Sequence, residues 1–197
     1  MSGVERAFLN ALDGLAYVTD GEGVVLRVGE PRWDEFATAA AAERALASAV
    51  VGRSVFDAMA GEEVRDAYRR IHRRVLDEPS GHFGFEYRCD APEVGRRMRM
   101  SISRVSGPGR RVRLLYQSQV LSAVSRPWMS LFEPQRIVEW ARAEAAVPLV
   151  RMCGFCQRLA WPPDEGGWVS SESYYRLGGP ADVRVSHGVC PTCTHKI

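Results

Sequence analysis

The chain has 197 residues, of which 46% are hydrophobic and 25% charged, and this composition argues against a disordered or a fibrous protein. The formal net charge of +2 is too small to indicate nucleic-acid binding by itself, although all but one of the 26 basic residues are arginine. No apolar run reaches the ~20 residues of a membrane span, and charged residues interrupt the N-terminal segment, unlike a secretory signal. We therefore expect a cytoplasmic protein, not bound to a membrane, with one ordinary domain and one small domain.

The first part of the chain predicts a hairpin followed by helices. The β-prone segments 15–19 and 24–28 flank the turn sequence Asp20-Gly21-Glu22-Gly23, which is typical of a hairpin. Pro31 is suited to the first turn of a helix, and the alanine-rich tract that follows extends helical propensity to Ala49.

The middle of the chain predicts one helix and three strands. Residues 62–76 place apolar side chains at helical spacing and arginines on the opposite face, as in an amphipathic helix. The segments 84–89, 98–105 and 111–119 have the composition and alternation of strands. With the hairpin, they predict an α+β fold: a five-stranded antiparallel sheet covered by helices on one face.

Three segments of this region share their order and spacing with a known family. They are Tyr17-Val18-Thr19-Asp20-Gly21, Arg32-Trp33-Asp34-Glu35-Phe36 and Val51-Gly52-Arg53-Ser54-Val55-Phe56-Asp57. With them, residues 8–122 resemble a PAS domain. The resemblance implies a sensory or interaction role and makes a homodimer one expectation, because such domains often dimerise. It does not identify a ligand, because the fold hosts several cofactors and many members bind none.

We predict three parts along the chain. Residues 1–122 form a PAS-like sensory domain, residues 123–150 a connector, and residues 151–197 a four-cysteine zinc-binding module. Within the connector, Glu133-Pro134 predicts the start of a helix that runs through Ile137, Val138, Trp140 and Ala141 towards Ala146.

Four of the five cysteines form two pairs with the same internal spacing, Cys153-Gly154-Phe155-Cys156 and Cys190-Pro191-Thr192-Cys193. A two-residue spacer lets both thiolates of a pair face one ion, so the two pairs predict a tetrahedral site for one structural zinc ion. The segment between the pairs is longer than in the simplest zinc ribbons and must have structure of its own. Its aromatic residues, Trp161, Trp168, Tyr174 and Tyr175, suffice for a small core.

Residues 151–196 also resemble the cysteine-rich tail of some bacterial signalling proteins. The shared pattern is Cys-x-x-Cys, then Trp168, then Ser186-His187-Gly188-Val189-Cys190-Pro191-Thr192-Cys193. The resemblance favours signalling and assigns no reaction. His187 is a candidate to replace one thiolate or to hydrogen-bond a ligand sulfur, whereas His195 has no expected role.

Other uses of the four thiols differ in how well the sequence fits them. Covalent haem attachment needs a histidine after the second cysteine, and Gln157 and Thr194 stand there instead. An iron–sulfur cluster also takes four thiolates and stays open on spacing alone. A dithiol switch that releases zinc on oxidation is compatible with the zinc site.

Two residues of the PAS-like region are candidate sensor groups. His72, on the amphipathic helix, is a candidate axial ligand for haem, and a histidine satisfied by hydrogen bonds is the simpler interpretation. Cys89 is interpreted as a small buried residue. The helical Asn-Cys-Arg-Phe type motif of flavin-binding photosensory relatives is missing, which disfavours blue-light chemistry.

The sequence contains no phosphate-binding glycine loop, nucleophile elbow or kinase signature, so we expect a non-enzymatic protein. The favoured function is a sensor that passes its signal to an unidentified signalling protein, with the zinc module supporting an interaction surface. One alternative is a nucleic-acid-binding zinc-ribbon regulator that uses arginine clusters, although nucleic acid is the less expected partner. The other is a haem or redox sensor.

Overall fold

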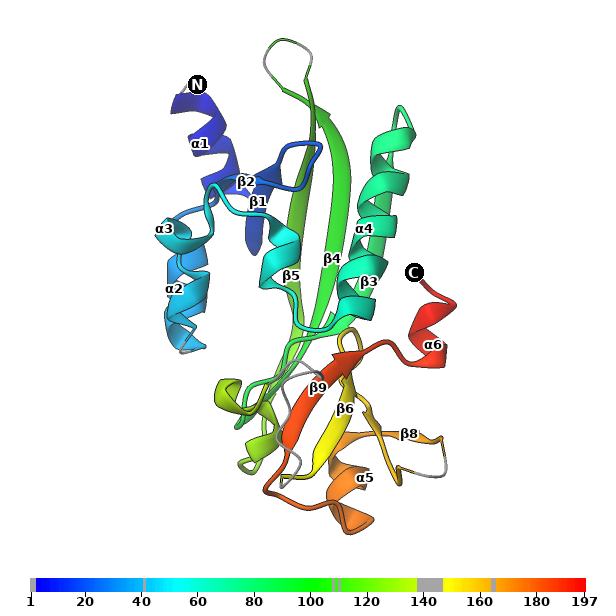
Figure 1. Ribbon diagram of the computed structural model, residues 1–197. Helices are drawn as coiled ribbons and strands as arrows, with labels where there is room; N and C mark the ends of the chain where they lie inside the picture. Colours follow the sequence, from blue (N-terminus) through cyan, green and yellow to red (C-terminus); the bar gives the residue numbers. More distant parts are fainter. Residues whose placement is uncertain (1–2, 41, 108, 110, 138–146, 164–165) are drawn as a thin grey trace. The chain divides into compact units, whose positions relative to one another are not determined.

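The computed structural model describes residues 3–40, 42–107, 109, 111–137, 147–163 and 166–197. Chain contacts divide the protein into two compact units (Figure 1). Unit 1 comprises Met1–Met59, Tyr68–Phe85 and Met98–Val120. Unit 2 comprises Ala60–Ala67, Glu86–Arg97 and Leu121–Ile197. In the described part of the chain, no helix has the length and apolar character needed to cross a membrane.

A five-stranded sheet is the main element of unit 1, and three of its strands continue into unit 2. The strands lie in the order β2-β1-β5-β4-β3. Their bounds are Leu15–Thr19 for β1, Val25–Val28 for β2, His82–Arg88 for β3, Val94–Ser106 for β4 and Val112–Ser125 for β5.

The sheet is antiparallel. The register of β1 against β2 and against β5 is antiparallel. The connections 89–93 and 107–111 are too short for the crossover that parallel neighbours require. The α+β class and the five-stranded antiparallel sheet predicted from the sequence are thus confirmed.

The helices of unit 1 surround this sheet. They are α1 (Gly3–Ala11), α2 (Arg32–Ala39), α3 (Ala47–Val50) and most of α4 (Glu62–Asp77), with short 3-10 turns η1 (Glu43–Ala45) and η2 (Val55–Ala58). On α4, the apolar residues Tyr68, Ile71 and Val75 are buried, as its amphipathic pattern predicts. The stacked rings of Tyr17 and Tyr116, 4.6 Å apart, mark the core face of the sheet.

The alanine-rich tract does not form the continuous helix that its propensity predicts. Helix α2 ends at Ala39, and Pro31 occupies its N-cap position, directly before the first turn. The Trp33 indole N–H donates to the Ala45 carbonyl oxygen at 2.6 Å, and Asp34 Oδ1 accepts from the Ala47 amide at 2.7 Å. These side chains form hydrogen bonds with backbone groups that are not paired within a continuous helix. Such bonds outweigh intrinsic helix propensity, which is a weak determinant of structure.

Unit 2 contains a second sheet that the sequence did not predict. Its order is β8-β7-β6-β9, and β9 runs parallel to β6 while the other neighbours are antiparallel. The strands are β6 (Leu149–Cys153), β7 (Leu159–Ala160), β8 (Trp168–Val169) and β9 (Arg184–Gly188), and the helices are α5 (Ser171–Arg176) and α6 (Pro191–Thr194).

Part of the predicted connector belongs to the core of unit 2. Met129, Leu131 and Phe132, in and beside the 3-10 turn η4 (Ser130–Phe132), are buried in this core. The helix predicted from Glu133-Pro134 begins only as the 3-10 turn η5 (Pro134–Arg136), and Ile137 bridges to Val185 of β9. The rest of that helix, Val138 to Ala146, lies outside the described residues. The remaining core residues are Val150, Met152, Leu159, Tyr174, Val183 and Val185.

Candidate metal centre

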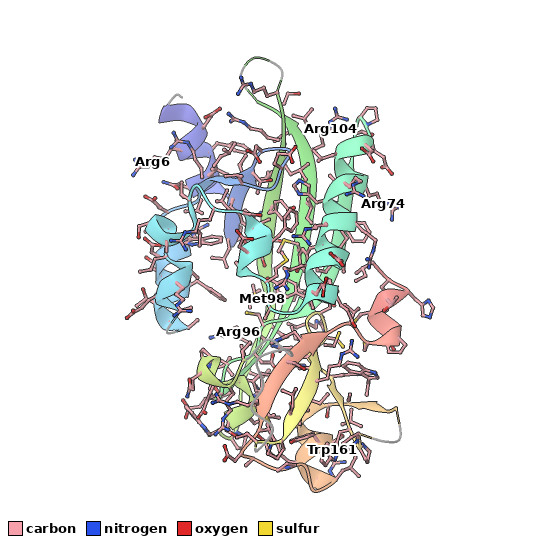
Figure 2. The ribbon with its side chains drawn as sticks, in the orientation of Figure 1. Arg6, Arg74, Arg96, Met98, Arg104 and Trp161 are labelled. Atoms are coloured by element: carbon pink, nitrogen blue, oxygen red, sulfur yellow. The ribbon has the colours of Figure 1, made fainter. Side chains whose placement is uncertain are left out.

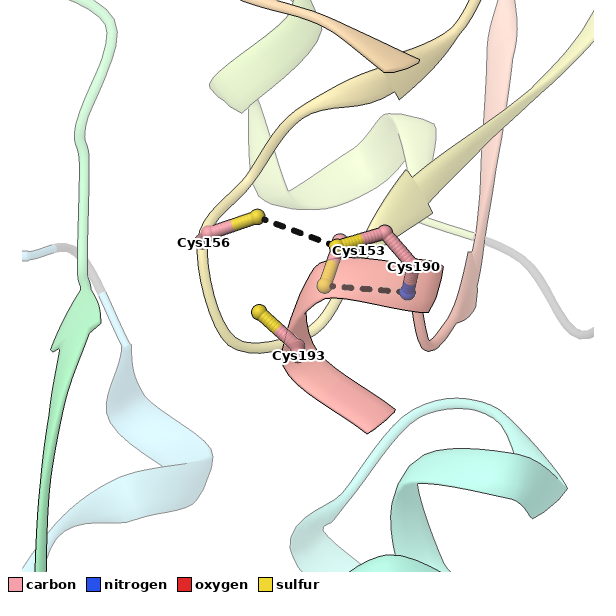
Figure 3. Close-up of side chains that lie close together, drawn as sticks. All are labelled: Cys153, Cys156, Cys190 and Cys193. Carbon is pink, nitrogen blue, oxygen red and sulfur yellow. Dashed lines mark hydrogen bonds between the residues drawn. The ribbon is translucent and has the colours of Figure 1, made fainter. Parts of the chain in front are cut away.

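The four paired cysteines converge at one point in unit 2 (Figure 3). The sulfur atoms of Cys153, Cys156, Cys190 and Cys193 all lie within 4.8 Å of one another, and those of Cys156 and Cys190 are 3.6 Å apart. A tetrahedral zinc with Zn–S bonds of ~2.3 Å places its sulfurs about 3.8 Å apart. All four cysteines are free thiols, so the spacing fits a shared ion and not a disulfide.

The first pair sits on a tight turn between β6 and β7. The Cys153 amide donates to the Arg158 carbonyl oxygen at 2.8 Å, and the Gln157 amide donates to the Cys153 carbonyl oxygen at 2.9 Å. Gln157 takes a left-handed conformation with φ 55°, which lets the chain reverse directly after Cys156. Both sulfurs of the pair are thereby directed to the same side of the turn (Figure 3).

The second pair opens α6, directly after β9. Cys190 is the N-cap of this helix, and its carbonyl oxygen accepts from the amides of Cys193 and Thr194 at 3.0 and 2.9 Å. The Cys190 amide in turn donates to Cys153 Sγ at 3.4 Å (Figure 3). Amide donors of this kind stabilise a thiolate.

The parallel pairing of β6 and β9 brings the two pairs together. Cys153 is opposite Gly188 in the register, and the Gly154 amide donates to the Gly188 carbonyl oxygen at 2.9 Å. A Cβ on Gly154 would lie 2.7 Å from Val64 Cγ2, so the turn approaches the first turns of α4 too closely for a side chain.

Glu63, from the same end of α4, holds both strands beside the cysteines. Its Oε1 accepts from the Arg151 guanidinium, and its Oε2 accepts from the Val189 amide at 3.2 Å. Arg151 lies two residues before Cys153, and Val189 precedes Cys190. The carboxylate therefore connects the backbone segments that carry the two cysteine pairs.

A buried carboxylate, Asp90, belongs to a second network of contacts that reaches the first pair. Its side chain is 1% exposed and forms ion pairs with Arg88 and Arg126, both at 2.8 Å. Its amide donates to Gln157 Oε1 at 3.0 Å, and the Arg88 amide donates to the Phe155 carbonyl oxygen at 2.7 Å. Sequence reasoning missed Asp90, because a carboxylate two residues from an arginine at a strand end is ordinary on a surface.

The electrostatics of the cluster favour a shared cation. The hydrogen bond from Cys156, helped by backbone amides, lowers the pKa of Cys153 well below that of an ordinary thiol. The same hydrogen bond raises the pKa of Cys156, and burial raises the pKa of Cys193 to about 12. One thiolate thus suppresses ionisation of its neighbours, and a divalent ion would supply the charge that lets the others ionise.

Neither histidine candidate is one of the clustered donor residues. His187 is not among the four donors of the cluster; it lies in β9, opposite Met152. His72 is buried in unit 1, with Nδ1 2.6 Å from the Tyr116 hydroxyl and Nε2 3.0 Å from the Gly21 carbonyl oxygen. Since a carbonyl oxygen only accepts, Nε2 carries a proton, and haem ligation would require one of these two hydrogen bonds to break.

Burial also decides the protonation of the remaining candidate groups. It lowers the pKa of His72 from 6.5, against the opposing effect of the Gly21 hydrogen bond and nearby carboxylates. It raises the pKa of Cys89, which is half-buried directly after β3. A neutral imidazole and a protonated thiol are the forms expected at neutral pH.

Neither a protein-family model nor a curated protein matches the chain. Among solved structures, it is similar to the PAS domain of Bordetella pertussis BvgS, with 15% identity over 60% of this chain and 85% of that one, at a TM-score of 0.43. It is also similar to the photoactive yellow protein domain of the sensor histidine kinase Ppr from Rhodospirillum centenum, with 18% identity over 56% and 96%, at a TM-score of 0.41. A third is the PAS domain of an HTR-like protein from Haloarcula marismortui, with 17% identity over 60% and 95%, at 0.36.

Proposed function

We propose that the chain is a non-enzymatic, cytoplasmic signalling protein in which a PAS-like domain senses a small ligand or a partner. Its cysteine module holds one zinc ion and supports an interaction surface for a signalling protein. The observation that carries the proposal is the convergence of Cys153, Cys156, Cys190 and Cys193 in a unit with its own core.

The donor set supports a structural role for the metal. Four cysteines fill all four positions of a tetrahedral zinc, so no position stays open for a water molecule or a substrate. Cys153 and Cys190 are fully buried, which also shields the ion from solvent. A closed site of this kind stabilises a fold and supplies no Lewis acid to a reaction.

The surface of unit 2 offers a suitable region for a partner. Trp128 is 59% exposed and borders a hollow of about 530 Å³ that Tyr175 and Arg136 also line. Tryptophan, tyrosine and arginine are the residues that most often dominate binding energy at protein interfaces. A partner that inserts an apolar side chain beside Trp128 would bury this exposed ring.

The test is elemental analysis of the purified protein for zinc and iron, with a visible spectrum of the same sample. We expect one zinc per chain and no colour. Cys153→Ser should lose the metal, and Cys89→Ser, which alters the cysteine outside the cluster, should retain it. Metal content unchanged by Cys153→Ser would refute the site, and iron with visible absorbance would favour haem or iron–sulfur sensing.

A further inference from the structure

Unit 1 has a cavity of about 310 Å³ on the face of the sheet that turns away from its core. Tyr17 and Tyr116 are paired in the register and stack on the core face. Their neighbours Val18 and Leu115 are also paired, and successive residues of a strand point to opposite faces. Val18 and Leu115 both line the cavity, which is therefore separate from the side of the sheet that holds His72.

Helix α1 forms the cover of this cavity. Phe8 and Leu9 line it from the helix, and Leu26 lines it from β2. Figure 1 shows α1 beside β2 and β1, and all three belong to unit 1. A Cβ on Gly29 would lie 2.8 Å from the Leu9 carbonyl oxygen, so the chain after β2 approaches the helix closely. The cavity thus lies between the sheet and α1, which is held close to the chain after β2, and its walls are predominantly apolar.

Three charged side chains line the cavity: Glu5, Arg27 and Arg113. Glu5 Oε1 lies 3.5 Å from Arg113 Nη1, the side chains being 32% and 15% exposed, and the buried Glu5 Oε2 accepts no hydrogen bond in the described part of the chain. Arg27 is paired with Val18 in the register and so shares its face, and its buried Nε has no hydrogen-bond partner in the described part of the chain. The two guanidinium groups and one carboxylate that line the cavity have a net charge of one positive unit. The buried Arg27 Nε also costs free energy, because it is a donor without an acceptor.

We propose that this cavity binds an amphipathic monocarboxylate, whose apolar chain packs between Phe8 and Leu115 and whose carboxylate accepts hydrogen bonds from Arg27. One anion neutralises the single excess charge and supplies the acceptor that Arg27 Nε lacks. A cavity of this size admits one chain of about ten carbons and is too small for a two-chain lipid. The inference gives a ligand class to the sensing half of the proposed function, and it is independent of zinc.

The experiment is calorimetric titration of the full zinc-containing chain with decanoate below its micellar concentration, and separately with decanol. We expect saturable binding of one decanoate per chain, about tenfold tighter than decanol, because a hydrogen bond to a charged group is worth ~1.5 kcal/mol or more. Arg27→Met retains an apolar stem. In this variant the ratio of the affinity for decanoate to that for decanol should fall to about one, while decanol binding persists.

The matched control is Arg6→Met. Arg6 lies on α1, the helix that covers the cavity, but it does not line the cavity, and its exposed side chain points away from the sheet (Figure 2). This variant should keep the full preference for decanoate. The proposal is overturned if neither probe binds saturably, if decanoate binds no tighter than decanol, or if Arg27→Met keeps the preference. None of these results would alter the zinc content, so they leave the metal site to its own test.

Discussion

The two units keep their folds by different means. Unit 1 buries large side chains such as Ile102, Leu114 and Tyr116 between a sheet and helices, and one of its buried polar groups, His72, is hydrogen-bonded at both ring nitrogens. Unit 2 buries side chains of similar size, such as Leu131, Met152 and Tyr174, but its strands are short, and it also contains a cluster of four thiols and a buried ion pair at Asp90. Four thiols gathered at one point favour a shared ion, so we expect unit 2 to depend on a metal and unit 1 on apolar packing.

Removal of the metal should produce the largest difference between the two units. Cys190→Ser, or prolonged chelation of the native chain, should unfold unit 2, because structural zinc contributes about 10–16 kcal/mol to such modules. Amide hydrogen exchange should then show lost protection in β6 and β9, with protection retained in β1 and around Tyr116. Equal loss of protection in both units would show that unit 1 depends on the metal as much as unit 2 does, and Cys89→Ser is the matched control.

Asp90→Ala tests whether the buried carboxylate is a second staple of unit 2. It would leave Arg126, whose side chain is 10% exposed, without its ion pair, and we expect a loss of about 3–5 kcal/mol in the free energy of unfolding. Denaturant unfolding of zinc-loaded protein measures this loss. Asp182→Ala removes a carboxylate that is 90% exposed and should cost less than ~0.5 kcal/mol. Equal effects of the two variants would refute a staple at Asp90.

In unit 1, Tyr116→Phe should have a smaller effect. The variant keeps the buried ring and removes the hydroxyl that donates to His72 Nδ1, so we expect a loss of about 1–3 kcal/mol. Tyr175→Phe, whose hydroxyl makes only a 3.4 Å contact with Ser130, serves as the control and should change stability by less than ~0.5 kcal/mol. A Tyr116→Phe chain as stable as the native one would show that this hydrogen bond contributes nothing.

The smallest expected effect is a pH dependence of unit 1. Because the pKa of His72 is lowered from 6.5 in the fold, the unfolded chain binds more protons below that pH, and stability decreases as pH falls through this region. NMR titration of the imidazole should give a midpoint below 6.5, and His72→Gln should reduce the slope of stability against pH. A midpoint at or above 6.5 would contradict the burial argument.

Local patterns predicted the elements of unit 1 well. The hairpin strand β1 has the predicted bounds, and α4 runs from Glu62 to Asp77 where 62–76 was predicted. The spacing of the cysteines also predicted which four thiols converge. These signals succeed because they depend on residues close in sequence or on the fixed geometry of a metal ion.

Long-range features escaped prediction. The parallel pairing of β6 with β9 joins segments that are far apart in the chain, and neither strand alternates clearly enough to reveal its partner. Asp90 and Glu63 act through backbone groups and arginines that only the fold brings near. The break after Ala39 depends on hydrogen bonds from Trp33 and Asp34, which propensity does not contain.

The parallel register of β6 and β9 has a consequence for how the protein reaches its fold. Cys153 and Cys156 lie on one local turn and can capture an ion early, whereas Cys190 arrives only after the chain 157–189 has closed into a loop. A slip of one residue along β9 would shift Cys190 by about 3.3 Å. It would also turn every side chain of the strand to the opposite face of the sheet. An ion bound at this site would then lack its third and fourth ligands, so metal binding would favour the native strand register over the shifted one.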